Sequence, residues 1–439
     1  MQNKTFLWLA TALLLSVSLW AQSADVLYET GMSRFQNKDW EGAKELFQKA
    51  VDTDPSYHPA LFQLGLTEFR LGDTKNAKEH MKQAISMDLE NKEYRSQYKL
   101  LGEVISMMSD GVRSMNNGAY DEAFETYQQV LEKDPNFAEA AYSMGLAKYK
   151  LKDYDAAVAY FKQALELNPT HENARAAITN VVKNTFNDAN NSYRRGDLET
   201  ALEQYQKVLE IDSTFYQAQF QIGVINTKMG MYTEAIQAYQ DALQINPDFY
   251  KGWYVLGLAQ KKQGNLDGAM ESFQKAIDVN SGYSKAYLAI ATIYMSQNKY
   301  EEAIKILNQA IQVDASYGPA YAALGKIHVD REEYEEAVSQ LELAVSFDDR
   351  DYKSWYHLAV SYNHLNNCEK AQEAARKATT LKKTFGGGWI ELGIAEYCGG
   401  TGNKTAALND LEQARRDRQW RKMAEYEMDK IKNPAKYEQ

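Results

Sequence analysis

Two cysteines are the residues of this chain with the most direct capacity for chemistry. Cys368 and Cys398 could form a disulfide, ligate a metal ion or act as nucleophiles. His364 lies four residues before Cys368, but Asn366 and Asn367 interrupt the helical pattern between them, and no further ligand is evident. The spacing therefore disfavours a metal site. A disulfide and a reactive thiol both stay open at this point.

The other residue types form no enzyme motif. No histidines stand at metalloprotease spacing, and the chain contains no serine nucleophile elbow. Gly386-Gly387-Gly388 lacks the lysine and the preceding strand of a phosphate-binding loop, so we expect a flexible turn there. Carboxylates are spread over many predicted helix faces, whereas a glycan-processing enzyme would need an inward pair in a deep cleft. We expect no catalytic residue, metal or cofactor. The histidines are His58, His80, His171, His328, His357 and His364.

The elements that must position these residues come from one repeated unit, best seen in residues 138–169. At helical period, Tyr142 and Gly145 fall on one stripe, and Ala157 and Phe161 fall on another. The polar break between the two stripes is long enough only for a tight turn. The unit therefore predicts two antiparallel helices, with small residues where the backbones approach and aromatic residues filling the rest.

The unit recurs along the chain, mostly at steps of about 34 residues, with two longer steps in the first half. Such a period is typical of a solenoid, in which each hairpin packs on its neighbours. The alanines equivalent to Ala157 are Ala43, Ala77, Ala123, Ala201, Ala235, Ala269, Ala303, Ala337 and Ala371, with a shifted one at Ala407.

The best copy of the pattern is Trp253-Tyr-Val-Leu-Gly257, followed by Gly264, Ala269 and Phe273. It resembles the tetratricopeptide-repeat (TPR) family, and the resemblance covers residues 24–417. Together with its N-terminal segment, the chain looks like an exported bacterial member of that family. It implies an all-α fold, a right-handed α-solenoid of about eleven helix-turn-helix repeats. A C-terminal capping helix would close it. The resemblance is strong for fold and weak for function, because the pattern records packing.

The same repeats suggest a domain organisation. Residues 1–23 combine a lysine, an apolar run and small residues at the end, as an export signal does. Extra residues before repeats three and five keep helical spacing, which predicts lengthened first helices. These helices either cover the edge where two blocks of repeats meet, or form a joint between the blocks or a docking surface for a partner. The expected segments are 1–23 signal peptide, 24–91 repeats one and two, 92–171 repeats three and four, 172–417 repeats five to eleven with a lengthened helix at 172–195, and 418–439 capping helix and tail.

Charge and location restrict the partners. A net charge of −11 argues against nucleic acid, which needs clustered lysine and arginine. The N-terminal apolar run is short for a membrane span, so we expect an exported protein, periplasmic or secreted, with no integral span after signal cleavage; an uncleaved anchor is the alternative. Stacked repeats bring Cys368 and Cys398 to one edge, and exported cysteine pairs oxidise. We therefore predict a Cys368–Cys398 disulfide.

In relatives, the first helices line a concave groove that holds peptides or partner helices. The first four repeats place apolar residues there, either as an open groove or as faces used up in helix packing. Further along, lysines recur beside aromatic residues, which suits acidic peptides, although solvated lysines are the alternative. Chaperone-binding members use a lysine and asparagine clamp that this chain does not reproduce. The expected partner-binding residues are Tyr142, Leu146, Tyr149, Phe220, Lys251, Tyr254, Lys261, Lys285, Lys326, Lys353 and Tyr356.

These patterns together predict a non-catalytic protein-interaction scaffold of the bacterial cell envelope. Its partners would be other proteins or peptides, and its oligomeric state is left open. The alternative is an accessory or regulatory subunit of an envelope enzyme, or of a secretion or assembly complex, whose chemistry lies on another chain.

Overall fold

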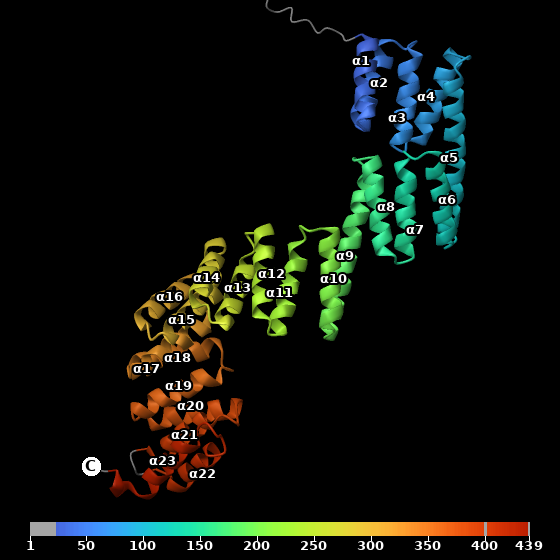
Figure 1. The fold of residues 1–439 in the computed structure, drawn as a ribbon. Helices are drawn as coiled ribbons and strands as arrows, with labels where there is room; N and C mark the ends of the chain where they lie inside the picture. Colours follow the sequence, from blue (N-terminus) through green and yellow to red (C-terminus); the bar gives the residue numbers. More distant parts are fainter. Residues whose placement is uncertain (1–22, 399–401, 438–439) are drawn as a thin grey trace, which may run out of the picture. The chain divides into compact units, whose positions relative to one another are not determined.

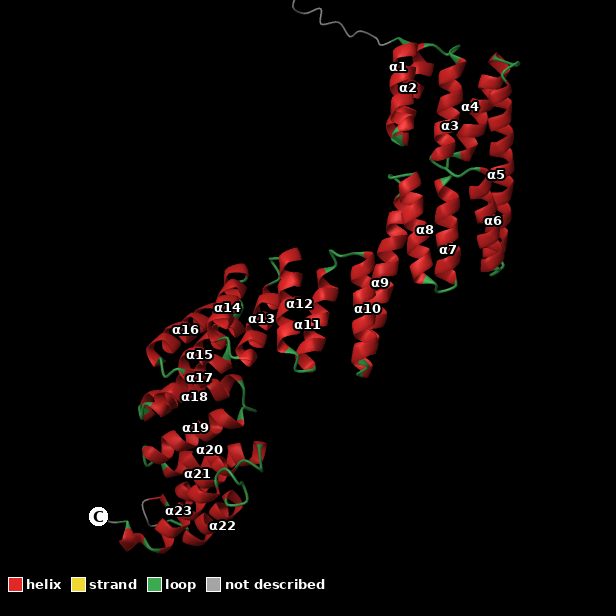
Figure 2. Ribbon diagram, in the orientation of Figure 1, coloured by secondary structure: helices red, strands yellow, loops and turns green. Residues whose placement is uncertain are grey.

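The computed structural model describes residues 23–398 and 402–437, and helices make up nearly all of them (Figure 2). Within those ranges there is no strand. The expected signal peptide lies almost wholly outside the described residues. The chain divides into two compact units between Asp212 and Ser213.

The first unit contains the hairpins of repeats one to five (Figure 1). Its helices are α1 (Ala24–Gln36), α2 (Trp40–Thr53), α3 (His58–Arg70), α4 (Thr74–Met87), α5 (Lys92–Asn116), α6 (Tyr120–Lys133), α7 (Ala138–Lys150), α8 (Tyr154–Leu167), α9 (Glu172–Arg195) and α10 (Leu198–Ile211).

The second unit contains repeats six to eleven and a final helix that covers the last hairpin. Its helices are α11 (Tyr216–Lys228), α12 (Tyr232–Ile245), α13 (Tyr250–Gln263), α14 (Leu266–Val279), α15 (Ser284–Ser296), α16 (Tyr300–Val313), α17 (Gly318–Asp330), α18 (Tyr334–Phe347), α19 (Tyr352–His364), α20 (Cys368–Leu381), α21 (Gly386–Glu396), α22 (Lys404–Ala414) and α23 (Arg421–Lys432), followed by the short 3₁₀ helix η2 (Pro434–Lys436). The predicted all-α solenoid of eleven hairpins with a C-terminal helix is confirmed.

The α13–α14 hairpin shows why the sequence folds this way. Gly264 adopts φ 94° and ends α13, and the Asn265 side chain then accepts a hydrogen bond from the Gly268 amide to start α14. A Cβ atom on Gly257 would lie 2.6 Å from the Phe273 ring. Glycine at this place therefore sets how closely the two helices approach.

Between the later repeats, an aromatic side chain donates a hydrogen bond to a carbonyl of each inter-repeat loop. The Trp253 indole N–H donates to the Pro247 carbonyl at 2.8 Å, six residues earlier in the chain. The same contact recurs in each following repeat, so these loops are held by side chains as well as by backbone turns. The other donors are Tyr287, Tyr321, Trp355 and Trp389.

Two long helices divide the first unit into tiers. Helix α5 has 25 residues, about 37 Å at 1.5 Å per residue, and occupies the place where the sequence predicts a lengthened helix. Its first half packs Leu101 and Val104 against α3 and α4, and its second half packs Gly111 against Tyr127 of α6. The long helix thus covers the edge of one pair of hairpins and begins the next pair. A docking role for it stays a prediction.

The two tiers of the first unit touch end to end, with α3 above α7 in Figure 1. The Trp40 indole donates to the Leu167 carbonyl at 2.9 Å, which gives an acceptor at the end of α8 a partner. Arg70 forms an ion pair with Asp134, and both side chains are nearly buried. These contacts join repeat one to repeat four and repeat two to the loop before repeat four.

The glycines at 386–388 are not a flexible turn, so that expectation was wrong. They form the first turn of α21, and the Gly386 amide donates to the Asp417 carboxylate at 3.0 Å. A Cβ atom on Gly386 or Gly387 would come within about 3 Å of Trp420. The glycines therefore make room for the segment that leads into α23, which caps the start of α21.

The predicted disulfide is present. Cys368 begins α20, Cys398 follows the end of α21, and their Cα atoms lie 5.8 Å apart. The bond ties repeat ten to repeat eleven and leaves no free cysteine among the described residues.

Candidate functional site

Three of the predicted binding residues line one hollow in the first unit. Tyr142, Leu146 and Tyr149 are half-buried on one face of α7, because they lie at positions i, i+4 and i+7. Phe161 of α8 lies behind them. The opposite wall comes from α9, and the hollow measures about 290 Å³. The α9 residues are Asn173, Ala176, Ala177 and Asn180.

Neighbouring groups set the polarity of this hollow. Burial, with the Glu139 carboxylate nearby, raises the pKa of Tyr142, so its hydroxyl stays neutral. The Tyr149 hydroxyl accepts a hydrogen bond from Asn184 at 2.6 Å. Its walls are thus uncharged aromatic rings with amide groups at the rim.

The corresponding face of the second repeat is closed. Phe62 and Phe69 are each only 2% exposed. The Tyr94 ring stacks on Phe62 with centroids 4.0 Å apart, and Phe137 stacks on Phe69 at 4.8 Å. Of the two outcomes expected for the apolar faces, packing holds in repeat two, whereas repeat four keeps an opening.

Two of the predicted lysines meet at a larger hollow in the second unit. Lys326 of α17 and Lys353 of α19 both line a space of about 690 Å³, with Leu288 and Pro319 among its apolar walls. Lys326 is paired with Asp330 at 2.5 Å, while the Lys353 side chain is exposed. Arg350 lines it too, and so do the carboxylates of Asp348 and Asp351, so the site combines an apolar floor with three basic and two acidic side chains.

The remaining predicted aromatic residues do not line that hollow, because they pack between repeats. Phe220 contacts Phe249 edge to face at 5.0 Å, and Tyr254 contacts Tyr283 in the same way at 5.3 Å. Burial raises the pKa of Tyr254. Their rings are half-buried, so each presents only part of its surface to a partner.

Tyr356 is covered more completely. Its ring lies 5.2 Å from Phe385 and 5.8 Å from Trp420, which belongs to the segment before α23. Burial, with Glu391 nearby, raises the pKa of Tyr356. The segment before α23 thus covers the face of Tyr356 that was expected to contact a partner.

The other predicted lysines are spread along the unit. Lys251 and Lys285 are exposed, and Lys251 lies 5.8 Å from the Tyr250 ring. Burial lowers the pKa of Lys261. Pro319 stands at the position one repeat after Lys285, so the row of lysines is interrupted at the larger hollow.

His357 is a lining residue of the larger hollow that the sequence did not single out. Burial, with Lys326 nearby, lowers its pKa to about 4, so the ring is neutral at pH 7. Its Nδ1 atom is buried and has no hydrogen-bond partner within the described part of the chain. In the sequence His357 stands beside Leu358, which is buried, within an amphipathic helix. A histidine in such a helix is read as part of its packing face, so nothing in the sequence marked His357 as a site residue.

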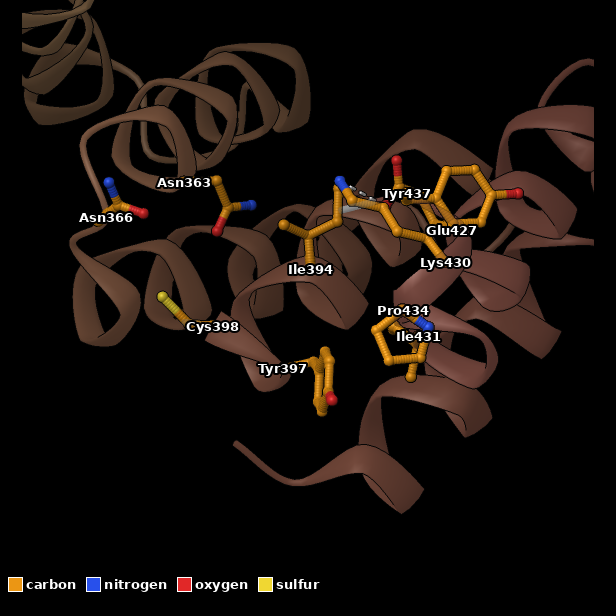
Figure 3. A pocket seen from close by; sticks show the side chains of 10 residues that line it. All are labelled: Asn363, Asn366, Ile394, Tyr397, Cys398, Glu427, Lys430, Ile431, Pro434 and Tyr437. Atoms are coloured by element: carbon orange, nitrogen blue, oxygen red, sulfur yellow. Dashed lines mark ion pairs between the residues drawn. The ribbon is translucent and has the colours of Figure 1, made fainter. Parts of the chain in front are cut away.

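A third hollow lies under the final helix (Figure 3). It measures about 320 Å³ and is framed by Tyr397, next to the disulfide, and by Ile431 and Pro434. Lys430 and Glu427 form an ion pair at 3.8 Å on its edge. Sequence reasoning missed this hollow, because it depends on how α23 folds back onto α21.

The described residues contain no cluster of three or more side chains suited to hold a metal ion. Among them, too, no helix has the combination of length and apolar content that crossing a bilayer requires.

Stacked helical hairpins with hollows along their first helices define a helical-repeat protein. Family models described as "Tetratricopeptide repeat" or "TPR repeat" match nine segments that together cover more than half of the chain. The chain therefore belongs to the tetratricopeptide-repeat family. The matched residues are 25–57, 58–91, 115–152, 138–171, 189–230, 225–264, 260–327, 318–351 and 352–385.

Individual relatives are more distant. The human protein named DnaJ homolog subfamily C member 7 is 31% identical over 118 residues, which are 26% of this chain and 24% of that protein. The chain thus spans about a quarter of that relative. A tetratricopeptide repeat protein from Parabacteroides merdae is 16% identical, with a TM-score of 0.42, and the match covers 57% of this chain and 99% of the other. Yeast Tom70 is 15% identical, with a TM-score of 0.40, over 94% and 96% of the two chains.

Proposed function

We propose that this chain is a non-catalytic scaffold that binds peptide segments or partner helices of other proteins along its first helices. The observation that carries the proposal is the 690 Å³ hollow, where Lys326 and Lys353 flank apolar walls. Apolar side chains of a partner supply affinity there. The exposed ammonium group of Lys353, with Arg350 in the same lining, favours acidic neighbours, while Lys326 is held by Asp330 and the carboxylates of Asp348 and Asp351 act against it. Membership of a family that mediates protein–protein interactions supports the same role.

The role of the Lys326 and Lys353 charges can be tested with a displayed peptide library. Peptides selected from a random displayed library on the full chain should carry an apolar residue beside aspartate or glutamate. Reversing both charges, with Lys326→Glu and Lys353→Glu, should weaken their binding by about tenfold or more, equivalent to about 1.4 kcal/mol. Isothermal titration calorimetry with the selected peptides measures the change.

The matched control reverses two lysines that do not line the hollow, Lys299 and Lys377, which are exposed. This variant changes the net charge equally and should bind as the parent does. Equal losses in both variants would mean that overall charge, and not the hollow, attracts the peptides. Unchanged binding in both would remove the hollow as the binding site.

Location belongs to the same proposal. We infer an exported protein of a bacterial cell envelope, periplasmic or secreted, from the apolar stretch within residues 1–23 and the Cys368–Cys398 bond. Intact mass measurement of the protein from the envelope fraction should show a chain that begins near Ala24 and has no free thiol. A full-length chain in the cytoplasm with two alkylatable thiols contradicts it.

A further inference from the structure

The first unit contains the same arrangement of helices twice. Helices α3, α4 and the first half of α5 recur as α7, α8 and the first half of α9. In both copies the long helix closes the end of a tier. The pairs of first residues are His58 and Ala138, Thr74 and Tyr154, and Lys92 and Glu172, so one constant offset relates the two copies. Each residue of the first copy thus has an equivalent in the second, and the chain serves as its own comparison.

In the first copy, the long helix fills the face of α3. Tyr94 stacks on Phe62 with an interplanar angle of 12°. Further along α5, Leu100 packs into the same cluster as Leu66 of α3, and Gln97 beside it is half-buried. The aromatic face of α3 is therefore occupied by side chains of the chain itself.

In the second copy, those filling side chains are small or polar. Ala174 stands in place of Tyr94, Ala177 in place of Gln97, and Asn180 in place of Leu100. The ring of Tyr142, which corresponds to Phe62, makes tilted contacts with the rings of Phe161 at 5.7 Å and His171 at 5.0 Å. Ala177 and Asn180 line the 290 Å³ hollow, whereas Ala174 is fully buried and does not line it, so the space lies at the positions equivalent to Gln97 and Leu100.

We propose that this hollow is a subsite for an uncharged aromatic side chain of a partner peptide. The inference rests on the proposed peptide-binding function and specifies its chemistry at repeat four. An aromatic ring suits walls made of Tyr142, Tyr149 and Phe161, because rings pack edge to face or offset against one another. In the first copy the Tyr94 ring stacks on Phe62, the residue equivalent to Tyr142, so a ring can pack at this helix position.

The rim can hold the peptide backbone and disfavours acidic side chains. The amides of Asn173 and Asn180 are exposed at the edge, where they can donate to and accept from a peptide backbone. Glu139 lies near Tyr142 and repels acidic side chains. This subsite therefore differs from the lysine-flanked hollow of the second unit, which selects acidic residues.

The probe for this subsite is N-acetyl-tyrosinamide, observed by saturation-transfer difference NMR with the full chain. Ring protons should receive saturation, and N-acetyl-leucinamide should give a clearly weaker signal. The blocking variant is Ala177→Gln with Asn180→Leu. It installs the residues that the first copy already carries, so it should fold. The ring signal should fall at least fivefold in this variant.

The control variant is Ala323→Gln, which narrows the hollow of the second unit and should leave the ring signal intact. Equal signals from the parent and the blocking variant, or a loss confined to Ala323→Gln, overturn the subsite. Equal signals from the tyrosine and leucine probes overturn its preference for aromatic rings. If selected acidic peptides still bind while the ring signal is absent, this inference fails and the scaffold function stands.

Discussion

Replacing Asp134 with alanine should destabilise the first unit by about 3–5 kcal/mol, the cost of leaving a buried charge without its partner. The Asp134 side chain is 3% exposed and that of Arg70 is 11% exposed, so water cannot replace the lost carboxylate. Asp134 also accepts the Asn136 amide at 3.1 Å. Amide hydrogen exchange read by mass spectrometry should show faster exchange in α3 and α7 and no change in α13 to α20.

The repeats supply a matched control for this substitution. Asp314 occupies a corresponding loop and accepts the Ser316 amide at 3.0 Å, and no ion pair of its carboxylate is found among the described residues. Asp314→Ala should therefore cost only about 1 kcal/mol, the value of an ordinary hydrogen bond. The paired change Arg70→Leu with Asp134→Leu should recover much of the loss, because no unpaired charge remains. Equal effects of Asp134→Ala and Asp314→Ala would show that the ion pair does not hold the tiers together.

The repeat fold could be predicted because the residues that shape it act within one hairpin or between neighbours. Gly257 and Phe273 stand in the two helices of one hairpin, and the equivalent pair meets in most copies of the unit, so their spacing alone reports the contact. The disulfide was predictable for the same reason, since Cys368 and Cys398 lie in adjacent repeats. Periodicity is informative wherever packing is local.

Contacts between distant repeats left no such signal. Trp40 and Leu167 meet across 127 residues, and only the length and direction of α5 bring them together. The first turn of α21 resembled a flexible glycine run, because Trp420, which fills the space beside it, follows only after the whole of α22. A local pattern cannot show what occupies the space next to it.

The binding residues were predictable only in part for the same reason. Tyr142 and Phe62 have equivalent positions in their repeats, yet one lines a hollow and the other is closed over. The difference lies in the long helices, because the Tyr94 ring of α5 stacks on Phe62, whereas α9 lines the hollow with the smaller Ala177 and the polar Asn180. Helix spacing predicts which face points to the groove, whereas the neighbouring helix decides whether that face is open.

A buried carboxyl should make the last repeat less stable as the pH rises. Glu391 of α21 faces α23, and burial raises its pKa to about 7, with the Glu427 carboxylate acting in the same direction. The Asn363 amide donates to Glu391 at 2.8 Å and partly opposes the shift. Tyr356 and the ion-paired Lys430 are the other titratable groups near this pair.

The sign follows from linkage. In the unfolded chain Glu391 ionises near pH 4.5, whereas in the folded chain it holds its proton until about pH 7. Stability is therefore lost as the pH rises from about 4.5 to 7, by an amount on the order of 3 kcal/mol at most. His357 acts in the opposite direction, because its pKa is lowered to about 4 and stability is regained as the pH rises from about 4 to 6.5. Asp410, whose pKa is raised to about 6, adds to the effect of Glu391.

Because Glu391 and His357 change the stability in opposite directions below pH 6.5, single substitutions are needed to separate their contributions. Glu391→Gln keeps an acceptor for Asn363 and removes the charge, so at pH 8 it should slow amide exchange in α21 and α23 relative to the parent. At pH 4.5 the variant and the parent should exchange alike, since the parent's carboxyl is then protonated. Glu396→Gln, on the same helix but paired with Arg376 at 2.5 Å, is the control and should give no gain at pH 8. A Glu391→Gln variant that exchanges faster than the parent at pH 8 would mean that the ionised carboxylate stabilises the α21–α23 contact and does not strain it.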